Sequence, residues 1–165
     1  MSIPTDLNVL VIEDDTPKLN AIKSCLSDEV GIDAANISVA RSLTSAIQML
    51  QIQVFSLCIV DMSIPTYDFD VDKTGGEPQA KGGLDILRYI QSETDSTKAI
   101  VITQYSEFPG SNGSASTLEQ LTEQLLRKFR SNLLAVLFYA SQKSEWRSKL
   151  KYSINGEFDD ESINS

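Results

Sequence analysis

The stretch Phe55-Ser-Leu-Cys-Ile-Val-Asp-Met-Ser-Ile-Pro65 decides the fold. Its first half is a short, nearly unbroken apolar run, which is typical of a strand buried on both faces, although a buried helical turn has the same pattern. The β-branched pair Ile59-Val60 and the nearby Pro65 favour the strand. Asp61 then stands at the carboxyl end of that strand, the edge of an open α/β sheet where ligands bind. Taken alone, Asp61 has a second interpretation, as the cap of a turn or of the next helix.

A second stretch of the same kind lies near the start of the chain. Residues 7–12 are mostly apolar with β-branched members, and they end in the acidic run 13–15. Thr16 and Pro17 predict the N-cap and the first position of a helix. Two buried strands that both end in carboxylates indicate more than a cap at Asp61.

The rest of the chain alternates between strand and helix patterns. Further strands are expected at residues 37–40, 99–103 and 133–139, and helices over residues 16–30, 42–50, 84–90, 116–129 and 146–154. Ser116 and Glu119 predict a capping box for the fourth helix. Five strands alternating with five helices predict an α/β fold, a doubly wound five-stranded parallel sheet with helices on both faces.

Two loops and a tail interrupt this pattern within one expected domain, residues 1–155. Residues 66–83 form a long loop, residues 104–116 a second extended loop, and residues 156–165 an acidic tail expected to be disordered. The alternating acids from Asp68 to Asp72 suggest a calcium loop, but the sixth position is Lys73 and the twelfth is Gln79. Calcium is therefore not expected there, and the insertion is either a surface for a partner or functionally silent.

Composition excludes several classes of function. The chain of 165 residues carries a net charge of −9, which argues against nucleic acid as a partner. With no long apolar run and no basic leader, we expect no membrane span and a cytoplasmic location, with Cys25 and Cys58 reduced in the core. The chain has no histidine, which excludes a Ser-His-Asp triad, a His-ligated zinc site and a His phosphocarrier within it.

The strand-end acids predict a metal site. In the expected sheet the first and third strands are neighbours, so Glu13, Asp14 and Asp61 meet at one edge. Two unit charges about 4 Å apart repel by roughly 4 kcal/mol at an effective dielectric near 20, and such a cluster either raises a pKa or binds a cation. Oxygen ligands favour Mg²⁺ or Ca²⁺, and a partly open site favours Mg²⁺. The alternative is an N-cap at Asp15 with two solvated acids.

With these residues in place, the sequence resembles the receiver domain of bacterial two-component response regulators. The resemblance covers residues 7–155. It rests on Val9-Leu-Val-Ile-Glu-Asp-Asp15, Ile59-Val-Asp-Met-Ser-Ile-Pro65, Gly83-Leu-Asp-Ile-Leu87 and Ile100-Val-Ile-Thr103, which follow one another in the family's order. It implies the CheY-like, flavodoxin-like receiver fold with strand order 2-1-3-4-5.

The resemblance also implies a function, a phosphoryl acceptor without its own output domain. Asp61 would take a phosphoryl group from a partner histidine kinase or histidine phosphotransfer protein, and the product would signal to an unknown protein target. Mg²⁺ would be held by Asp14, Asp61 and the backbone carbonyl of Ser63, with Glu13 acting through water. Thr103 would bind the phosphoryl oxygens. The protein would be no enzyme toward small molecules, beyond slow loss of its own phosphoryl group.

Four departures from the family keep a second interpretation open. The family glycine, Gly83, follows the phosphoacceptor by 22 residues, which implies a long insertion, and the loop after Thr103 is also long. Gln104 replaces a small residue. The family lysine is assigned to Lys143, although Ser141 is an alternative occupant of that position. The second interpretation is a receiver-fold interaction module that works without phosphorylation. A haloacid-dehalogenase-type phosphatase is excluded, because Ser63 stands where its second acid is needed.

Overall fold

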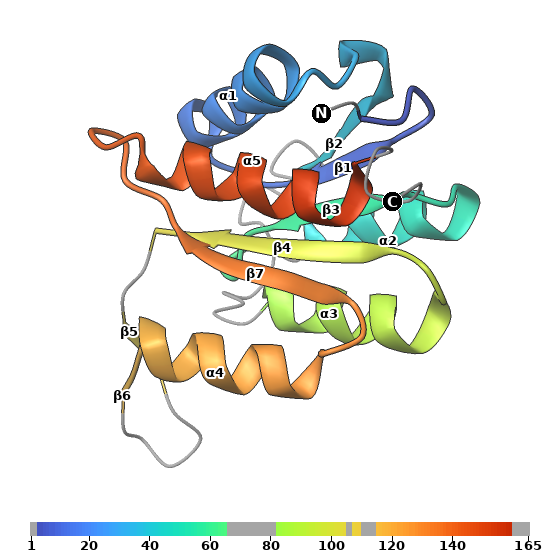
Figure 1. The fold of residues 1–165 in the computed structure, drawn as a ribbon. Helices are drawn as coiled ribbons and strands as arrows, with labels where there is room; N and C mark the ends of the chain where they lie inside the picture. The colour runs from blue at the N-terminus through green and yellow to red at the C-terminus, as the bar shows by residue number, and fades with distance from the viewer. Residues whose placement is uncertain (1–2, 66–81, 105–106, 110–114, 160–165) are drawn as a thin grey trace.

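The computed structural model describes residues 3–65, 82–104, 107–109 and 115–159. Its centre is a five-stranded parallel sheet with strand order β2-β1-β3-β4-β7 (Figure 1). The strands are β1 (Val9–Ile12), β2 (Ile37–Ala40), β3 (Leu57–Val60), β4 (Lys98–Thr103) and β7 (Leu133–Phe138). The predicted fold class and strand order are therefore confirmed.

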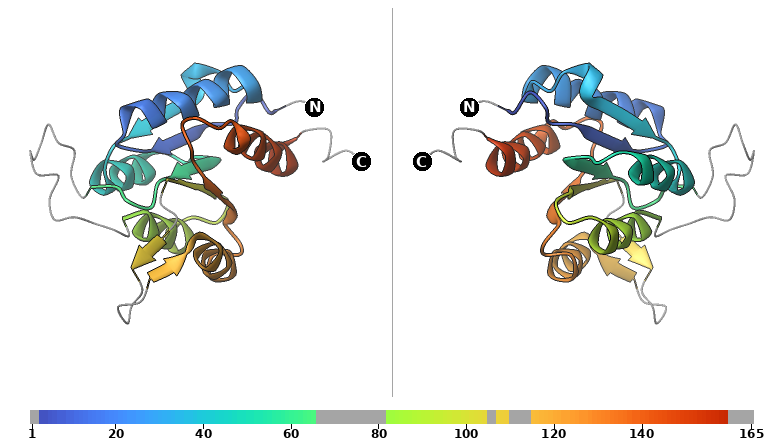
Figure 2. Two further views of the ribbon diagram at one scale, coloured as in Figure 1. Left: turned by 90° about the vertical axis from the view of Figure 1, so that its left-hand side faces the viewer. Right: turned by 90° about the vertical axis from the view of Figure 1, so that its right-hand side faces the viewer.

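Helices cover both faces of the sheet. They are α1 (Thr16–Ser24), α2 (Leu43–Ile52), α3 (Gly82–Glu93), α4 (Leu118–Lys128) and α5 (Glu145–Phe158). A core of buried side chains joins α1 and α5 to one face, and a second core joins α2, α3 and α4 to the other. The side views in Figure 2 show the sheet between these two helical layers. Every residue of β1 and β3 is buried, as expected of central strands covered on both sides.

Helix α1 begins at Thr16, where the predicted helix begins, and its N-cap is the residue named in the alternative interpretation. Asp15, rather than Thr16, is the N-cap: its carboxylate accepts a hydrogen bond from the backbone N–H of Lys18 at 3.0 Å. At its far end α1 runs into the π-helical turn η1 (Cys25–Val30), which ends at Gly31 in the left-handed region, φ 92°. A 3₁₀ turn, η2 (Ala34–Asn36), then leads into β2.

Two predicted boundaries near the loops differ from the structure, and one predicted loop contains two short strands. Helix α3 begins at Gly82, and the cap of α4 is Thr117 with Gln120, one residue beyond the predicted Ser116 and Glu119. Within the predicted loop 104–116, β5 (Glu107–Pro109) pairs antiparallel with β6 (Ala115–Thr117). The predicted loop 66–83 lies outside the described residues, except for its last two, which are helical.

The predicted disordered tail begins too early. Helix α5 continues to Phe158, and Asp159 after it is buried. The physical reason is that Phe158 extends the inward row of Trp146, Leu150 and Ile154 by one more turn and packs on the same core. Residues 160–165 lie outside the described residues. Among the helices that the structure describes, none combines the length and the apolar character that crossing a bilayer requires.

Candidate functional site

The register of β1 and β3 brings the predicted acids together. Ile12 pairs with Val60, so the residues that follow these strands are neighbours, and the N–H of Asp61 donates to the carbonyl of Ile12 at 3.1 Å. One carboxylate oxygen from each of Glu13, Asp14 and Asp61 lies within 4.8 Å of the others. We call these three residues the acidic cluster.

The acidic cluster is largely shielded from water. Glu13 is 1% exposed and Asp61 5%, whereas Asp14 is half-buried. The pKa of Glu13 is raised to about 7, first by burial and second by the charge of Asp61, while the ammonium of Lys18 acts in the opposite direction. Burial is also the main reason that the pKa of Asp14 is raised. The raised pKa values of Glu13 and Asp14 agree with the repulsion expected among three neighbouring carboxylates.

Lys18 is a member of this site that the sequence analysis missed. Its Nζ lies 2.6 Å from Oε1 of Glu13 and 3.2 Å from Oδ1 of Asp61, and its side chain is fully buried. Nζ also donates a hydrogen bond of 2.8 Å to the carbonyl oxygen of Ile102 in β4. The signal that points to Lys18 is its spacing, because it precedes the buried Ile22 by four residues and the buried Cys25 by seven, on the inward side of α1.

Glu13 is committed to the protein through both of its carboxylate oxygens. Oε2 accepts hydrogen bonds of 3.1 Å from the backbone N–H groups of Asp14 and Asp15, while Oε1 faces Lys18. Glu13 thus holds the start of the loop after β1 in place and pairs with the lysine. This arrangement differs from the expectation that Glu13 acts chiefly through a metal-bound water.

The other predicted site residues divide into two groups. Thr103 is the last residue of β4 and is fully buried, and Ser63 lies half-buried two residues beyond Asp61. Lys143 is exposed and has no ion pair among the described residues. It lines a hollow of about 230 Å³ together with its alternative, Ser141. The structure does not bring either of these two residues into contact with the acidic cluster.

Two glycines at the start of α3 fix the segment that follows Asp61. A Cβ atom on Gly83 would lie 2.4 Å from the carbonyl oxygen of Asp61, and one on Gly82 would lie 2.7 Å from Cγ1 of Ile64. The N–H of Gly83 also donates to the carbonyl of Met62 at 3.0 Å. Only glycine allows this approach. The start of α3 is therefore packed directly against the segment that follows Asp61.

The acidic cluster fits a hard divalent cation. Oε1 of Glu13 and Oδ1 of Asp61 face the ammonium of Lys18, so the other oxygen of Asp61 and the carboxylate of Asp14 are the side-chain oxygens open to an ion. The donors are all oxygens, the set that Mg²⁺ prefers, and the half-buried Asp14 leaves a side open to water. Asp14, Asp61 and the carbonyl of Ser63 are the groups that would hold the ion, because Lys18 faces the buried oxygen of Glu13.

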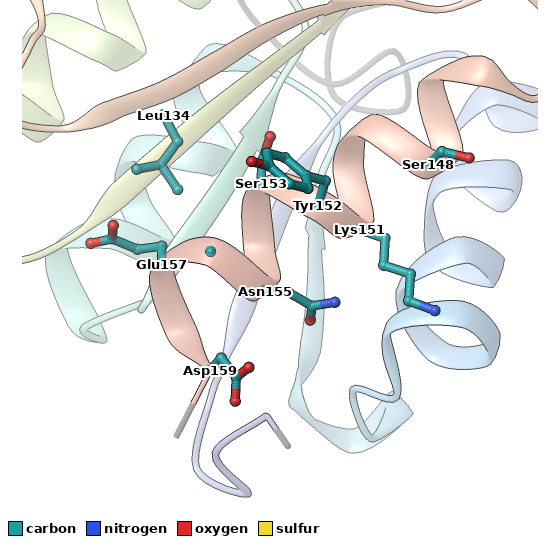
Figure 3. Close-up of a pocket in the computed structure, with 9 residues that line it drawn as sticks. Leu134, Ser148, Lys151, Tyr152, Ser153, Asn155, Glu157 and Asp159 are labelled. Atoms are coloured by element: carbon teal, nitrogen blue, oxygen red, sulfur yellow. The ribbon is translucent and has the colours of Figure 1, made fainter. Parts of the chain in front are cut away.

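A second hollow lies away from the acidic cluster. It has a volume of about 680 Å³ and lies along the outer side of α5, beside Leu134 of β7 (Figure 3). Tyr152, which is 82% exposed, lines it together with residues from Ser148 to Asp159. None of Glu13, Asp14, Lys18 or Asp61 contributes to it, so the acidic cluster remains the candidate site.

Comparison with known proteins places this geometry on a known fold. No family model matches the chain. A receiver domain protein (CheY-like) from Methanospirillum hungatei JF-1 superposes with a TM-score of 0.58 at 16% identity, covering 92% of this chain and 95% of the other. The receiver domain of PhyR from Erythrobacter litoralis gives 0.56 at 19% identity over 91% and 88%. The chain has the fold of a response-regulator receiver domain.

A third structure with this fold contains a metal ion. TrrA from Thermotoga maritima, in complex with Mg²⁺ and a beryllium fluoride, matches with a TM-score of 0.53 at 18% identity, covering 89% of this chain and 98% of that one.

The chain is also similar in sequence to two uncharacterized proteins of Sinorhizobium fredii (strain NBRC 101917 / NGR234). It is 21% identical to y4jR over 146 residues, 88% of this chain and 95% of that protein. It is 30% identical to y4jS over 89 residues, 54% of this chain, and spans only 20% of that protein.

Proposed function

We propose that this chain is a response-regulator receiver that accepts a phosphoryl group on Asp61. The observation that carries the proposal is the position of Asp61. It stands at the carboxyl end of the central strand β3, on a receiver fold, within 4.8 Å of two further carboxylates. The donor would be a phosphohistidine on a histidine kinase or phosphotransfer protein, and the output would be contact with another protein.

Each residue of the site has a task in this proposal. A carboxylate oxygen of Asp61 attacks the phosphorus, the bond between phosphorus and the donor imidazole breaks, and the electron pair of that bond stays on the imidazole nitrogen. Asp14 and Asp61 would hold Mg²⁺, which would supply positive charge to the transferring group. The hydroxyl of Thr103, buried at the end of β4, would then bind a phosphoryl oxygen.

Composition and the buried thiols support the remaining parts of the proposal. The net charge of −9 favours protein partners over nucleic acid. Cys25 and Cys58 are buried and unpaired, which supports a reducing compartment such as the cytoplasm. The chain would act on no small-molecule substrate, and its own reaction would be slow loss of the phosphoryl group.

A second candidate function is favoured by one observation. Lys143, the residue predicted to pair with the phosphoryl group, is exposed and forms no ion pair among the described residues. This arrangement suits a receiver-fold module that binds its partner in a single state.

Intact mass after incubation with a small phosphodonor separates the two candidates. A phosphoacceptor gains the mass of one phosphoryl group when it is incubated with Mg²⁺, and it gains no mass when it is incubated with EDTA in place of Mg²⁺. A chain that stays unmodified with acetyl phosphate, with phosphoramidate and with a phosphorylated phosphotransfer protein favours the second candidate.

A further inference from the structure

Lys18 reaches the acidic cluster from an unexpected element. It lies in the first turn of α1, three residues beyond the acidic run that follows β1, and its backbone N–H donates to the N-cap Asp15. Its side chain runs inward to the edge of the sheet, where the ends of β1, β3 and β4 meet around Nζ. Lys18 is therefore held at both ends. The cap residue Asp15 binds its backbone N–H, and oxygens at the ends of β1, β3 and β4 surround its ammonium.

The surroundings of the ammonium are complete. A lysine ammonium has three N–H donors, and three oxygens lie close to Nζ: Oε1 of Glu13, Oδ1 of Asp61 and the carbonyl oxygen of Ile102. The ring of Tyr139 lies 5.8 Å away. Burying a lysine costs free energy that an apolar residue at this inward position would not, and a buried ion pair is weak evidence for a stabilising role. A role in the chemistry of Asp61 explains the lysine better.

We propose that Lys18 is the cationic residue of the phosphoacceptor site, in the role that the sequence analysis assigned to Lys143. Before transfer its ammonium offsets the repulsion between Glu13 and Asp61. After transfer Asp61 carries one more negative charge, and Lys18 pairs with the phosphoryl oxygens. This inference rests on the proposed function for the second step, but the first step concerns the unmodified chain alone.

The same contacts divide the acidic cluster between two cations. Oε1 of Glu13 and Oδ1 of Asp61 belong to Lys18, which leaves Asp14 and the remaining oxygen of Asp61 for a divalent ion. Lys18 and a bound cation then repel each other while both attract a phosphoryl group. Removal of the lysine charge should therefore strengthen the binding of a divalent cation and weaken the binding of a phosphoryl group. Structural damage to the site would weaken the binding of both.

The structure also supplies a reporter. The ring of Trp146 lies 5.2 Å from the ring of Tyr139, which in turn lies beside Nζ of Lys18. Since Trp146 is the only tryptophan in the sequence, its fluorescence reports on this side of the site.

The test uses the full-length chain with Mg²⁺ alone, and with beryllium fluoride at saturating Mg²⁺ as the phosphoryl mimic. Affinities are measured by Trp146 fluorescence and by the ligand-dependent rise in melting temperature. We expect Lys18→Met to bind Mg²⁺ about tenfold more tightly than wild type and beryllium fluoride about tenfold more weakly. Lys23→Met is the matched control, because it removes the same charge from an exposed position of the same helix. Lys143→Met tests the rival residue.

Each outcome decides the inference. Weaker binding of both ligands to a folded Lys18→Met would reduce the lysine to a structural role and overturn the proposal, as would a loss of beryllium fluoride binding in Lys143→Met alone. If wild type binds no beryllium fluoride, the proposed function fails, but the Mg²⁺ measurement still tests the role of Lys18 in the unmodified chain. Tighter binding of Mg²⁺ to Lys18→Met than to wild type supports Lys18 as the cation of the site. Unchanged binding of Mg²⁺ refutes it. If Lys18→Met does not fold, Glu13→Gln/Lys18→Met removes both charges of the pair. Weaker binding of beryllium fluoride to this double variant, with Mg²⁺ bound at least as tightly as in Glu13→Gln, supports the proposal, and weaker binding of both ligands or unchanged binding of beryllium fluoride refutes it.

Discussion

The close approach of α3 to the segment after Asp61 makes a sharp prediction for Gly83→Ala. The new Cβ would lie 2.4 Å from the carbonyl oxygen of Asp61 and 2.8 Å from Cα of Met62, so the helix or the segment must move. Overpacking of this kind costs about 1–3 kcal/mol. Weakening the hydrogen bond from Gly83 to Met62 costs about 1 kcal/mol more. The gain in helix propensity returns up to about 1 kcal/mol. We therefore expect a net loss of about 1–3 kcal/mol in the free energy of unfolding.

The same substitution at Gly156 provides the matched control. Gly156 lies in α5, and no atom lies within 4 Å of the Cβ that alanine would add. Only the propensity gain remains there, so Gly156→Ala should stabilise the chain by up to about 1 kcal/mol. Urea denaturation measures both, and melting temperatures should shift by about 2–4 °C per kcal/mol. If Gly83→Ala is as stable as Gly156→Ala, the close contact between α3 and the segment after Asp61 does not hold that segment in place.

Three further predictions concern Glu13, Asp14 and Ser63. The pKa of Glu13 is raised from its ordinary 4.5 to about 7, so folding favours the protonated form of this side chain. The stabilisation that protonated Glu13 gives the folded chain is therefore present below about pH 4.5 and is lost as the pH rises to about 7. In EDTA, the unfolding free energy of wild type relative to Glu13→Gln should therefore fall over that window, and a flat difference would contradict the raised pKa. Asp14→Ala should weaken Mg²⁺ binding at least about tenfold by calorimetry, and equal affinity in both proteins would exclude Asp14 as a ligand. Ser63 offers no amide or carboxylate to orient an attacking water, so the phosphorylated chain should decay slowly, and Ser63→Asn should accelerate the decay about tenfold. An unchanged decay rate of the phosphorylated mass would show that Ser63 does not set the lifetime.

The sequence predicted the sheet and the acids because both depend on short-range patterns. Buried strands such as 57–60 form unbroken apolar runs, and in a parallel sheet their carboxyl ends lie at one edge. The meeting of Asp61 with Glu13 and Asp14 follows from that edge together with the expected strand order, which makes β1 and β3 neighbours. The favoured caps, Thr16 and Ser116, each lie one residue from the observed caps, Asp15 and Thr117, because neighbouring serine, threonine and aspartate residues compete for the same role. Asp15 had been named only as an alternative cap.

Lys18 could not be assigned in the same way, because a lysine in a helix pattern is normally solvated. Its inward position was visible from its spacing to Ile22, but its partners come from β1, β3 and β4, which only the tertiary structure brings together. The extent of α5 was underestimated for a related reason. The acids around Phe158 suggested a tail, whereas its burial against the core decides that the helix continues.

The most direct test of the central claim is to locate the phosphoryl group chemically. An acyl phosphate on an aspartate is reduced by borohydride to homoserine, which peptide mass spectrometry assigns to a single residue. After incubation with Mg²⁺ and acetyl phosphate, the account predicts homoserine at position 61 in the wild type and none in Asp61→Asn. Homoserine at position 14 or 15, or an unmodified wild-type chain that is folded and saturated with Mg²⁺, would contradict the assignment of Asp61 as the phosphoacceptor.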